Sequence, residues 1–167
     1  MKWHNAQKAE RLTLAHNDAL RALSLVDMKS DAVAELSLAL LYLGEGMKKT
    51  VSTAMGNSDP LILRFFVSML ERLYNVPRSD MRCEIHIRAD QNARQIIKYW
   101  SSTLTIPRSN FSKPSIDDRT RGKPTYLGYK GVCVVRCSRV AIQRKLVYIA
   151  TMFCSRLAEQ GAVSSSG

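Results

Sequence analysis

The chain has 167 residues, 46% of them apolar, so its length and composition predict one compact domain with a sizeable core. Its formal net charge is +11, and the excess lies late in the chain: residues 78–167 hold 16 basic and 6 acidic residues, against 9 and 8 in residues 1–77. This asymmetry indicates a polyanion-binding face, for nucleic acid first and an acidic membrane surface second. The alternative is a surface that is basic only for solubility.

Several classes of protein are disfavoured. The chain contains no run of 18 apolar residues, and its start, MKWHNAQKAERL, is too polar for a secretory signal. The cysteines form no CxxC pair and the histidines are scattered, so buried reduced thiols are favoured over a zinc site, and we expect an intracellular, cytoplasmic protein. These residues are Cys83, Cys133, Cys137, Cys154, His4, His16 and His86.

The first third of the chain reads as two helices. Residues 5–28 are rich in Ala and Leu, without Gly or Pro, and predict an amphipathic helix. Ser30 and Asp31 can cap a second helix, which runs to Gly44 and is apolar nearly all round. Such a helix should be buried by protein on more than one side. The short segment 49–57 is rich in strand-forming residues.

The middle of the chain predicts a helix followed by a strand. Asn57 or Ser58 can cap a helix over residues 60–75, with Pro60 in its first turn. Residues 81–88 then alternate between apolar and polar, which is typical of a half-buried strand. The inward set is Cys83, Ile85 and Ile87, and the outward set is Arg82, Glu84, His86 and Arg88.

The last third predicts two further helices and two strands. A helix is expected over 90–105, a strand over 111–116, and a loop with Gly, Pro and charges over 117–129. A second strand over 131–137 leads into a final helix over 140–157.

The predicted order is α-α-β-α-β-α-β-β-α, an α+β pattern with a mostly antiparallel sheet. We divide the chain into an N-terminal helical extension (1–29), a main domain (30–158) and a flexible tail (159–167).

The stretch LALLYLGEG, Leu38 to Gly46, raises a question of charge. A glycine after a helix is ordinary, because the residue that ends a helix often needs positive φ. Glu45, between Gly44 and Gly46, is less ordinary, because the helix dipole already puts negative charge at this end. Either a cation offsets Glu45, or Glu45 is a plain exposed residue at the end of a helix.

This stretch aligns without gaps to the nine-residue signature of the LAGLIDADG homing endonucleases. Leu38, Ala39 and Leu41 match, Gly44 is the small residue and Glu45 the acid. The segments NSDPLILRFF, CEIHI, TLTIPRSNFSKP and GVCVVRCS resemble small bacterial LAGLIDADG-like proteins with a single motif, over roughly residues 33–157. The resemblance implies a saddle-shaped sheet with helices packed on one face, in a bacterial intracellular protein that acts on DNA.

The resemblance also implies a function: site-specific cleavage of double-stranded DNA by a homodimer with a divalent metal. In that family, paired carboxylates at two helix ends hold Mg²⁺ or another divalent cation. Glu45, with Gly44, would be the metal ligand here. Lys48 and Lys49 would neutralise charge at the scissile phosphate, or else they are ordinary cations at a helix end.

Because the chain holds one motif, the resemblance implies that two copies pair through it. The expected interface residues are Leu38, Ala39, Leu41 and Tyr42. The alternative is that residues 5–28 cover this helix within one chain.

The family's sheet faces DNA, which makes the outward residues of 81–88 and a basic cluster the expected contacts. The strand contributes Arg82, Glu84, His86 and Arg88, with His86 read as a polar surface residue rather than a general base. The cluster, within residues 108–145, comprises Arg108, Lys113, Arg119, Arg121, Lys123, Lys130, Arg136, Arg139, Arg144 and Lys145. The loop 117–129 is expected to order on the DNA backbone. Solvated surface charge is the alternative reading for each residue.

Two departures from the family pattern bear on catalysis more than on fold. Only one strand fits between Met47 and Asn57, where the family usually has two, and Leu43 stands where the motif usually has a polar residue. Two alternatives to cleavage therefore stay open: a DNA-binding regulator of the same fold, or an RNA-binding, splicing-helper protein.

Overall fold

The computed structural model describes residues 2–164, and the side chains of residues 5–161. The chain divides into two compact units, Met1–Ala34 and Glu35–Gly167, and each is considered by itself. The division falls just inside the second helix, slightly later than the boundary expected after residue 29.

The first unit is a single long helix and a turn. Helix α1 covers Lys2–Ser24 and ends before a turn in which Asp27 Oδ1 accepts a hydrogen bond of 2.9 Å from the Lys29 amide. Ser30 Oγ then accepts from the Val33 amide at 3.3 Å, which confirms the predicted cap of the second helix.

The remaining elements follow the predicted order, and that order is confirmed. They are α2 (Asp31–Glu45), β1 (Thr53–Asn57), α3 (Pro60–Tyr74), β2 (Arg82–Arg88), α4 (Ala93–Leu104), β3 (Ser115–Asp117), β4 (Val132–Cys137) and α5 (Val140–Ser164), with short 3₁₀ turns between some of them. Helix α5 passes the predicted end at residue 157, because Ala158, Glu159 and Gln160 are good helix formers. The predicted tail is thus helical to Ser164, and residues 165–167 lie outside the described residues.

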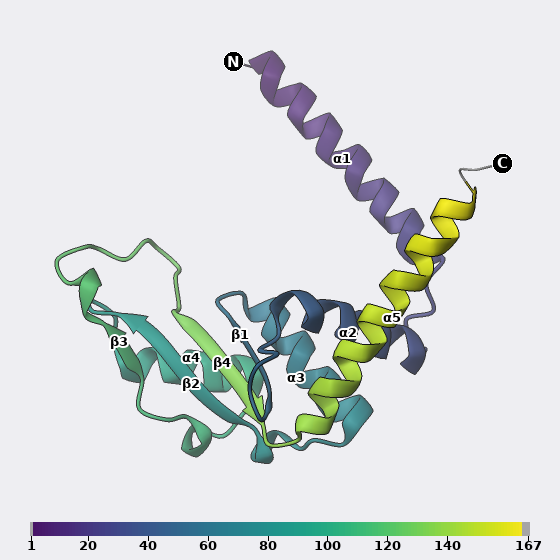
Figure 1. Cartoon of the computed structure of the whole chain (residues 1–167). Coiled ribbons are helices and arrows are strands. Elements are labelled where there is room, and N and C mark those ends of the chain that lie inside the picture. The colour runs from purple at the N-terminus through teal and green to yellow at the C-terminus, as the bar shows by residue number, and fades with distance from the viewer. Residues whose placement is uncertain (1, 165–167) are drawn as a thin grey trace. The chain divides into compact units, whose positions relative to one another are not determined.

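The sheet is four-stranded and mixed, in the order β1-β4-β2-β3. Strand β4 pairs antiparallel with both β1 and β2, whereas β3 runs parallel to β2. The chain is therefore α+β, with one parallel pair in the sheet (Figure 1).

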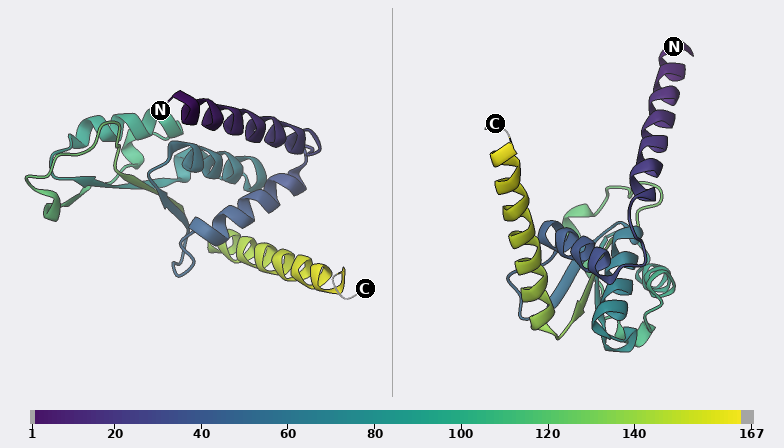
Figure 2. Two further views of the ribbon diagram at one scale, coloured as in Figure 1. Left: turned by 90° about the horizontal axis from the view of Figure 1, so that it is seen from above. Right: turned by 90° about the vertical axis from the view of Figure 1, so that its right-hand side faces the viewer.

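Helices cover one face of this sheet. In the left view of Figure 2 the strands are seen nearly edge-on, with α3 and α4 along one side. The inward strand residues and the buried faces of α2, α3 and α4 form a single core, in which the rings of Tyr42 and Phe66 stack with centroids 6.2 Å apart. Within the second unit, no described helix lies across the other face, which we call the outer face.

Local signals explain where the covering helices begin and end. The cap of α3 is Asp59, whose Oδ1 accepts a 2.8 Å hydrogen bond from the Leu61 amide. This corrects the expectation of Asn57 or Ser58: Asn57 Oδ1 instead accepts from the Asp59 amide and positions the cap. Helix α3 ends at Asn75 in the left-handed conformation.

The cysteines are all free. Cys83, Cys133 and Cys137 are buried as predicted, and contact with the Cys83 thiol, together with burial, raises the pKa of Cys133. Cys154 is exposed on α5, contrary to the expectation of burial, because it lies beyond Ala150, the last described residue of that helix that is buried. Among the described residues, no helix has the length and apolar character needed to span a bilayer.

Candidate nucleic-acid interface

Strand β2 supplies the centre of the outer face. Its burial pattern confirms the predicted alternation: Cys83, Ile85 and Ile87 are buried, while Arg82, Glu84, His86 and Arg88 alternate with them and keep exposed surface. The period of two in the sequence is enough to set this division, because successive side chains of a strand point to opposite faces.

The register with β4 adds residues to this face. Arg82 lies opposite Arg136, Glu84 opposite Val134, and His86 opposite Val132. Arg136 donates to Glu84 at 2.8 Å, and His86 Nε2 lies 3.7 Å from the other carboxylate oxygen. Sequence reasoning missed this pairing, since strand register cannot be read from one strand at a time. Part of the charge on the outer face is thus neutralised from within.

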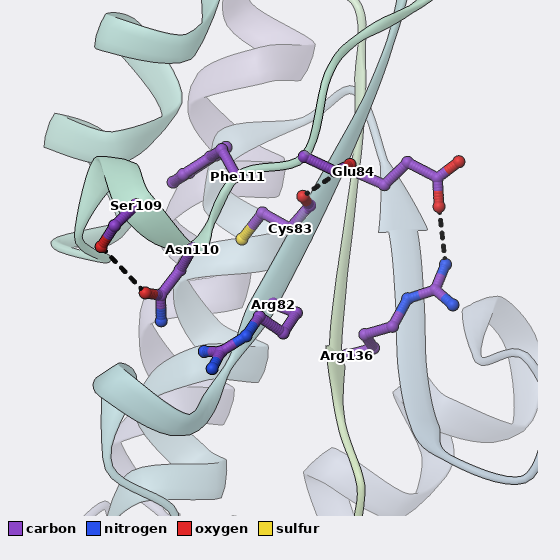
Figure 3. A pocket seen from close by; sticks show the side chains of 8 residues that line it. Arg82, Cys83, Glu84, Ser109, Asn110, Phe111 and Arg136 are labelled. Carbon is purple, nitrogen blue, oxygen red and sulfur yellow. Dashed lines mark hydrogen bonds and ion pairs between the residues drawn. The ribbon is translucent and has the colours of Figure 1, made fainter.

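A hollow of about 440 Å³ opens beside Arg82 and Arg136 (Figure 3). Arg82 Nη1 donates to the carbonyls of Ser79 and Met81, at 2.9 and 3.3 Å. The side-chain Nδ2 of Asn110 donates to the same two carbonyls, at 2.7 and 2.8 Å. These bonds hold the hollow's polar wall in place, and the two guanidiniums point in different directions rather than converging.

The loop between β3 and β4 is anchored within the chain. Arg88 donates to Thr125 Oγ1 at 2.9 Å and to the Lys123 carbonyl at 3.0 Å. Asp90 accepts from both the amide and the hydroxyl of Thr125, at 2.7 and 2.5 Å. The expectation that this loop orders on DNA is corrected, because the end of β2 already holds it.

Two of the predicted DNA contacts in this region already have acidic partners. Arg119 makes a two-pronged ion pair with Asp117, and this guanidinium lowers the pKa of the Asp117 carboxyl. Arg121 pairs with Asp118 at 2.7 Å. All four side chains are exposed enough for phosphate to compete for the arginines, since surface ion pairs are weak.

The other predicted basic residues are divided between locations. Arg108, Lys113 and Lys123 are exposed. The Lys130 ammonium lies 5.7 Å from the ring centroid of Tyr99, a residue of α4. Arg139 donates to the Tyr74 carbonyl at the end of α3 at 2.9 Å. We therefore remove Arg139 from the expected outer-face set, because its guanidinium caps a helix of the covered side.

The end of α2 places Glu45 at the surface. Its Oε2 accepts a 3.1 Å hydrogen bond from Asn57 Nδ2, at the end of β1. The chain then turns beside β1, with Gly46 bridged to Met55 and the Met47 amide donating to the Ala54 carbonyl at 2.9 Å. The segment from Met47 to Asn57 therefore holds one strand, β1, as the sequence predicted. The isolated bridge at Gly46 adds no second strand.

The two lysines after the motif have different surroundings. Lys48 Nζ donates to the Leu43 carbonyl at 2.6 Å, so it caps the last turn of α2. Lys49, like Lys48, lines a separate hollow of about 470 Å³ with Arg144 and Tyr148. The structure favours the helix-end reading for Lys48, while the catalytic role expected of both lysines stays a prediction.

A divalent ion would find only one acidic ligand at this helix end. Within the described part of the chain, no three of His, Cys, Asp and Glu gather closely enough to hold a metal ion. Glu45 offers a carboxylate and Gly44 a carbonyl, which is too few oxygens for Mg²⁺ from one chain. The Glu45 carboxylate and the Gly44 carbonyl therefore fit a cation site shared between two copies of the chain better than a site within one copy.

The expected dimer residues are largely unavailable. Leu38, Ala39 and Tyr42 are fully buried in the core of the same chain, and Leu41 is partly buried against it. We correct the interface accordingly. The surface of α2 carries Leu40, 38% exposed, and Gly44, where an added Cβ would meet no atom within 4 Å.

No protein-family model, curated protein or solved structure matches this chain.

Proposed function

We propose that this protein is a LAGLIDADG-like, site-specific endonuclease of double-stranded DNA that acts as a homodimer. The observation that carries the proposal is the division of the motif: most of its apolar residues are buried in the core or packed against it, while Gly44 and Glu45 are exposed at the end of α2. A fold that uses this helix only for its core would not need an acid there.

The outer face supports the DNA part of the proposal. No described helix of the second unit covers it, and it presents Arg82, Arg88 and Arg136 along two adjacent strands. Arginine on a strand can donate two hydrogen bonds to a guanine edge in the major groove, while flanking Lys and Arg contact phosphates. Glu84 lies between these arginines and can accept from cytosine.

The exposed stripe of α2 supports pairing of two copies. Gly44 leaves open space at its Cβ position, and Leu40 lies one turn earlier on the same side. A small residue lets two helices approach closely, and a twofold axis through this stripe would bring both Glu45 side chains together.

Such a pair would supply two carboxylates and two Gly44 carbonyls, an oxygen-rich set suited to Mg²⁺ or another divalent cation. When bound there, the cation would activate water and stabilise the leaving oxygen of the phosphodiester. Glu45 itself would hold the cation, and Asn57 would orient the carboxylate through its Nδ2 donor.

One observation favours a second candidate, a DNA-binding regulator without cleavage. Glu45 and Lys48 both have structural partners: Asn57 donates to the Glu45 carboxylate, and Lys48 donates to the Leu43 carbonyl. These contacts would give Glu45 and Lys48 a structural role, with no part in cleavage. The outer face would then act by binding alone.

The deciding experiment begins with selection of duplexes from a random library by purified protein in Ca²⁺, which fills Mg²⁺ sites while usually not supporting cleavage. We expect a near-palindromic motif. Mg²⁺ should then cut that duplex, and Glu45→Gln should lower the rate about a thousandfold or more without loss of binding. Glu159→Gln, a neutralised exposed acid on α5, is the matched control and should leave the rate unchanged.

The outcomes separate the candidates. Selection of a motif that Mg²⁺ never cuts would establish the regulator. Failure to select any motif would overturn site-specific binding. Stronger competition by structured RNA than by duplex DNA at equal salt would favour the RNA-binding alternative.

A further inference from the structure

The loop after β3 builds an aromatic hollow at one end of the outer face. The hollow has a volume of about 290 Å³ and is lined by His86, Arg88, Asp117, Tyr126 and Tyr129, among others. It thus combines side chains of β2 and β3 with two rings from the loop. Of these residues, the function proposed above uses only Arg88.

The two tyrosines form the apolar wall. Their ring centroids lie 4.9 Å apart with the planes tilted by 40°, and the Tyr129 amide donates to the Tyr126 carbonyl. Tyr129 is half-buried, whereas Tyr126 is 68% exposed. A large ring held against another ring, with most of its own surface open, offers a face for stacking.

The wall is held in place from both ends: Arg88 and Asp90 bind Thr125 before it, and further contacts hold residues 129–131 after it. The Tyr129 carbonyl accepts from Gln91 Nε2 at 2.8 Å, and the Lys130 carbonyl accepts from Trp100 Nε1 at 2.8 Å. Gly131, at φ 70°, comes so close to β2 that an added Cβ would lie 2.5 Å from the His86 carbonyl. The hollow is therefore preformed.

The polar wall carries hydrogen-bonding groups of both kinds. The His86 ring is exposed on the outer face, and the Asp117 carboxylate, kept ionised by Arg119, can accept. Arg88 is already engaged by Thr125 and the Lys123 carbonyl, so it shapes the site and supplies positive charge. An aromatic face beside a donor and an acceptor is what a flat, polar-edged ring requires.

We propose that this hollow takes one unstacked nucleobase of the bound nucleic acid, stacked on Tyr126 with its edge toward His86 and Asp117. The proposal rests on the proposed binding of DNA by the outer face and adds a specific contact to it. Lys123, whose carbonyl accepts from Arg88 and whose side chain is exposed, would attract an adjoining phosphate.

The test compares three labelled 20-base-pair duplexes: one fully paired, one with a single bulged nucleotide at its centre, and one with a bulged abasic residue. The abasic bulge bends the duplex similarly but offers no base. Equilibrium binding is measured in Ca²⁺ for the wild type and for Tyr126→Ala, Tyr126→Phe and Leu127→Ala. Leu127 is the neighbouring, fully exposed side chain, which does not line the hollow.

We expect the wild type to prefer the bulged base over both other duplexes by about fivefold or more, the range of stacking on one aromatic ring. Tyr126→Ala should remove the preference and keep affinity for paired DNA, while Tyr126→Phe and Leu127→Ala should retain it. Equal affinity for base and abasic bulges, or a preference unaffected by Tyr126→Ala, would overturn the base site alone. A wild type that binds none of the duplexes would overturn the proposed function, and this site with it.

Discussion

Asn57 Nδ2 donates a 3.1 Å hydrogen bond to Oε2 of Glu45, joining the last residue of β1 to the last residue of α2. Both side chains are at the surface, at the point where the motif presents its acid. The side-chain amide of Asn57 therefore holds the Glu45 carboxylate in one orientation.

Changing Asn57→Asp tests this relationship directly. The new carboxylate can still accept from the Asp59 amide but repels Glu45, so we expect a loss of about 1 kcal/mol or less in the free energy of unfolding at pH 7. Millimolar Ca²⁺ should restore the stability, because two adjacent carboxylates can hold the ion. Urea titrations with and without Ca²⁺ measure both effects. No Ca²⁺ effect in the variant would mean that this helix end cannot accept a cation.

Larger side chains at the two glycines of the motif should affect the free energy of unfolding very differently. At Gly46 an added Cβ would lie 2.5 Å from the Tyr42 carbonyl oxygen, whereas at Gly44 it would meet nothing. Gly46→Ala should therefore lower the free energy of unfolding by about 2 kcal/mol or more. Gly44→Phe should leave the stability of one copy within about 1 kcal/mol of the wild type.

If α2 pairs with a second copy, Gly44→Phe should nevertheless abolish dimers by filling the gap between the helices. Sedimentation velocity measures the assembly and thermal unfolding checks the fold. A Gly44→Phe protein that remains dimeric would remove this stripe from the interface.

Neutralising an acid on the outer face should strengthen DNA binding. Glu84 holds Arg136 at 2.8 Å and approaches His86, so Glu84→Gln should free positive charge for phosphate. For a duplex of unrelated sequence, where base contacts do not contribute, we expect tighter binding by about threefold to tenfold, and a steeper salt dependence by about one unit of log–log slope. The exposed pair contributes little to stability, about 0.5 kcal/mol.

Fluorescence anisotropy from 50 to 200 mM salt measures both the affinity and the slope for this variant. Glu159→Gln makes the same charge change on α5 and should alter the slope less. Equal effects of the two variants would mean that net charge acts, rather than the outer face.

Acid sensitivity is expected from a cluster that joins α2, α3 and α5. Glu35 Oε1 accepts from Tyr74 at 2.7 Å and from Lys145 at 2.5 Å. Burial works to raise the pKa of Glu35, but the hydrogen bonds from Lys145 and Tyr74 and the charge of Lys145 outweigh it, so the pKa is lowered. A carboxyl with a lowered pKa stabilises the fold above its unfolded-state pKa, and this contribution is lost as the pH falls.

Glu35→Gln should therefore lower the free energy of unfolding by about 1 kcal/mol at pH 7 and by progressively less below about pH 4.5. Urea unfolding at pH 7, 5, 4 and 3 measures this difference. Tyr74→Phe removes one of the two donors and should give a smaller effect with the same sign. A Glu35→Gln effect that does not change with pH would mean that packing, not charge, is lost.

The periodicity of apolar residues and the local signals that start and end helices determined much of this fold. The alternation from Cys83 to Ile87 predicted which side of β2 is buried, because a strand has a period of two whatever its neighbours are. Ser30 and Pro60 marked helix starts, since capping and the fixed φ of proline are local effects. The order of helices and strands followed from such signals alone.

Tertiary structure decided what pairs with what. The contact of Arg136 with Glu84 depends on the register of β4 against β2, and the hollow beneath Tyr126 needs residues from two strands and a loop. Tertiary structure also decided which side of α2 is buried, because its sequence is apolar nearly all round and does not distinguish one side from another. Packing against Phe66 and its neighbours buries Tyr42 and leaves Leu40 and Gly44 at the surface, because only the three-dimensional core determines which side of an all-apolar helix it covers.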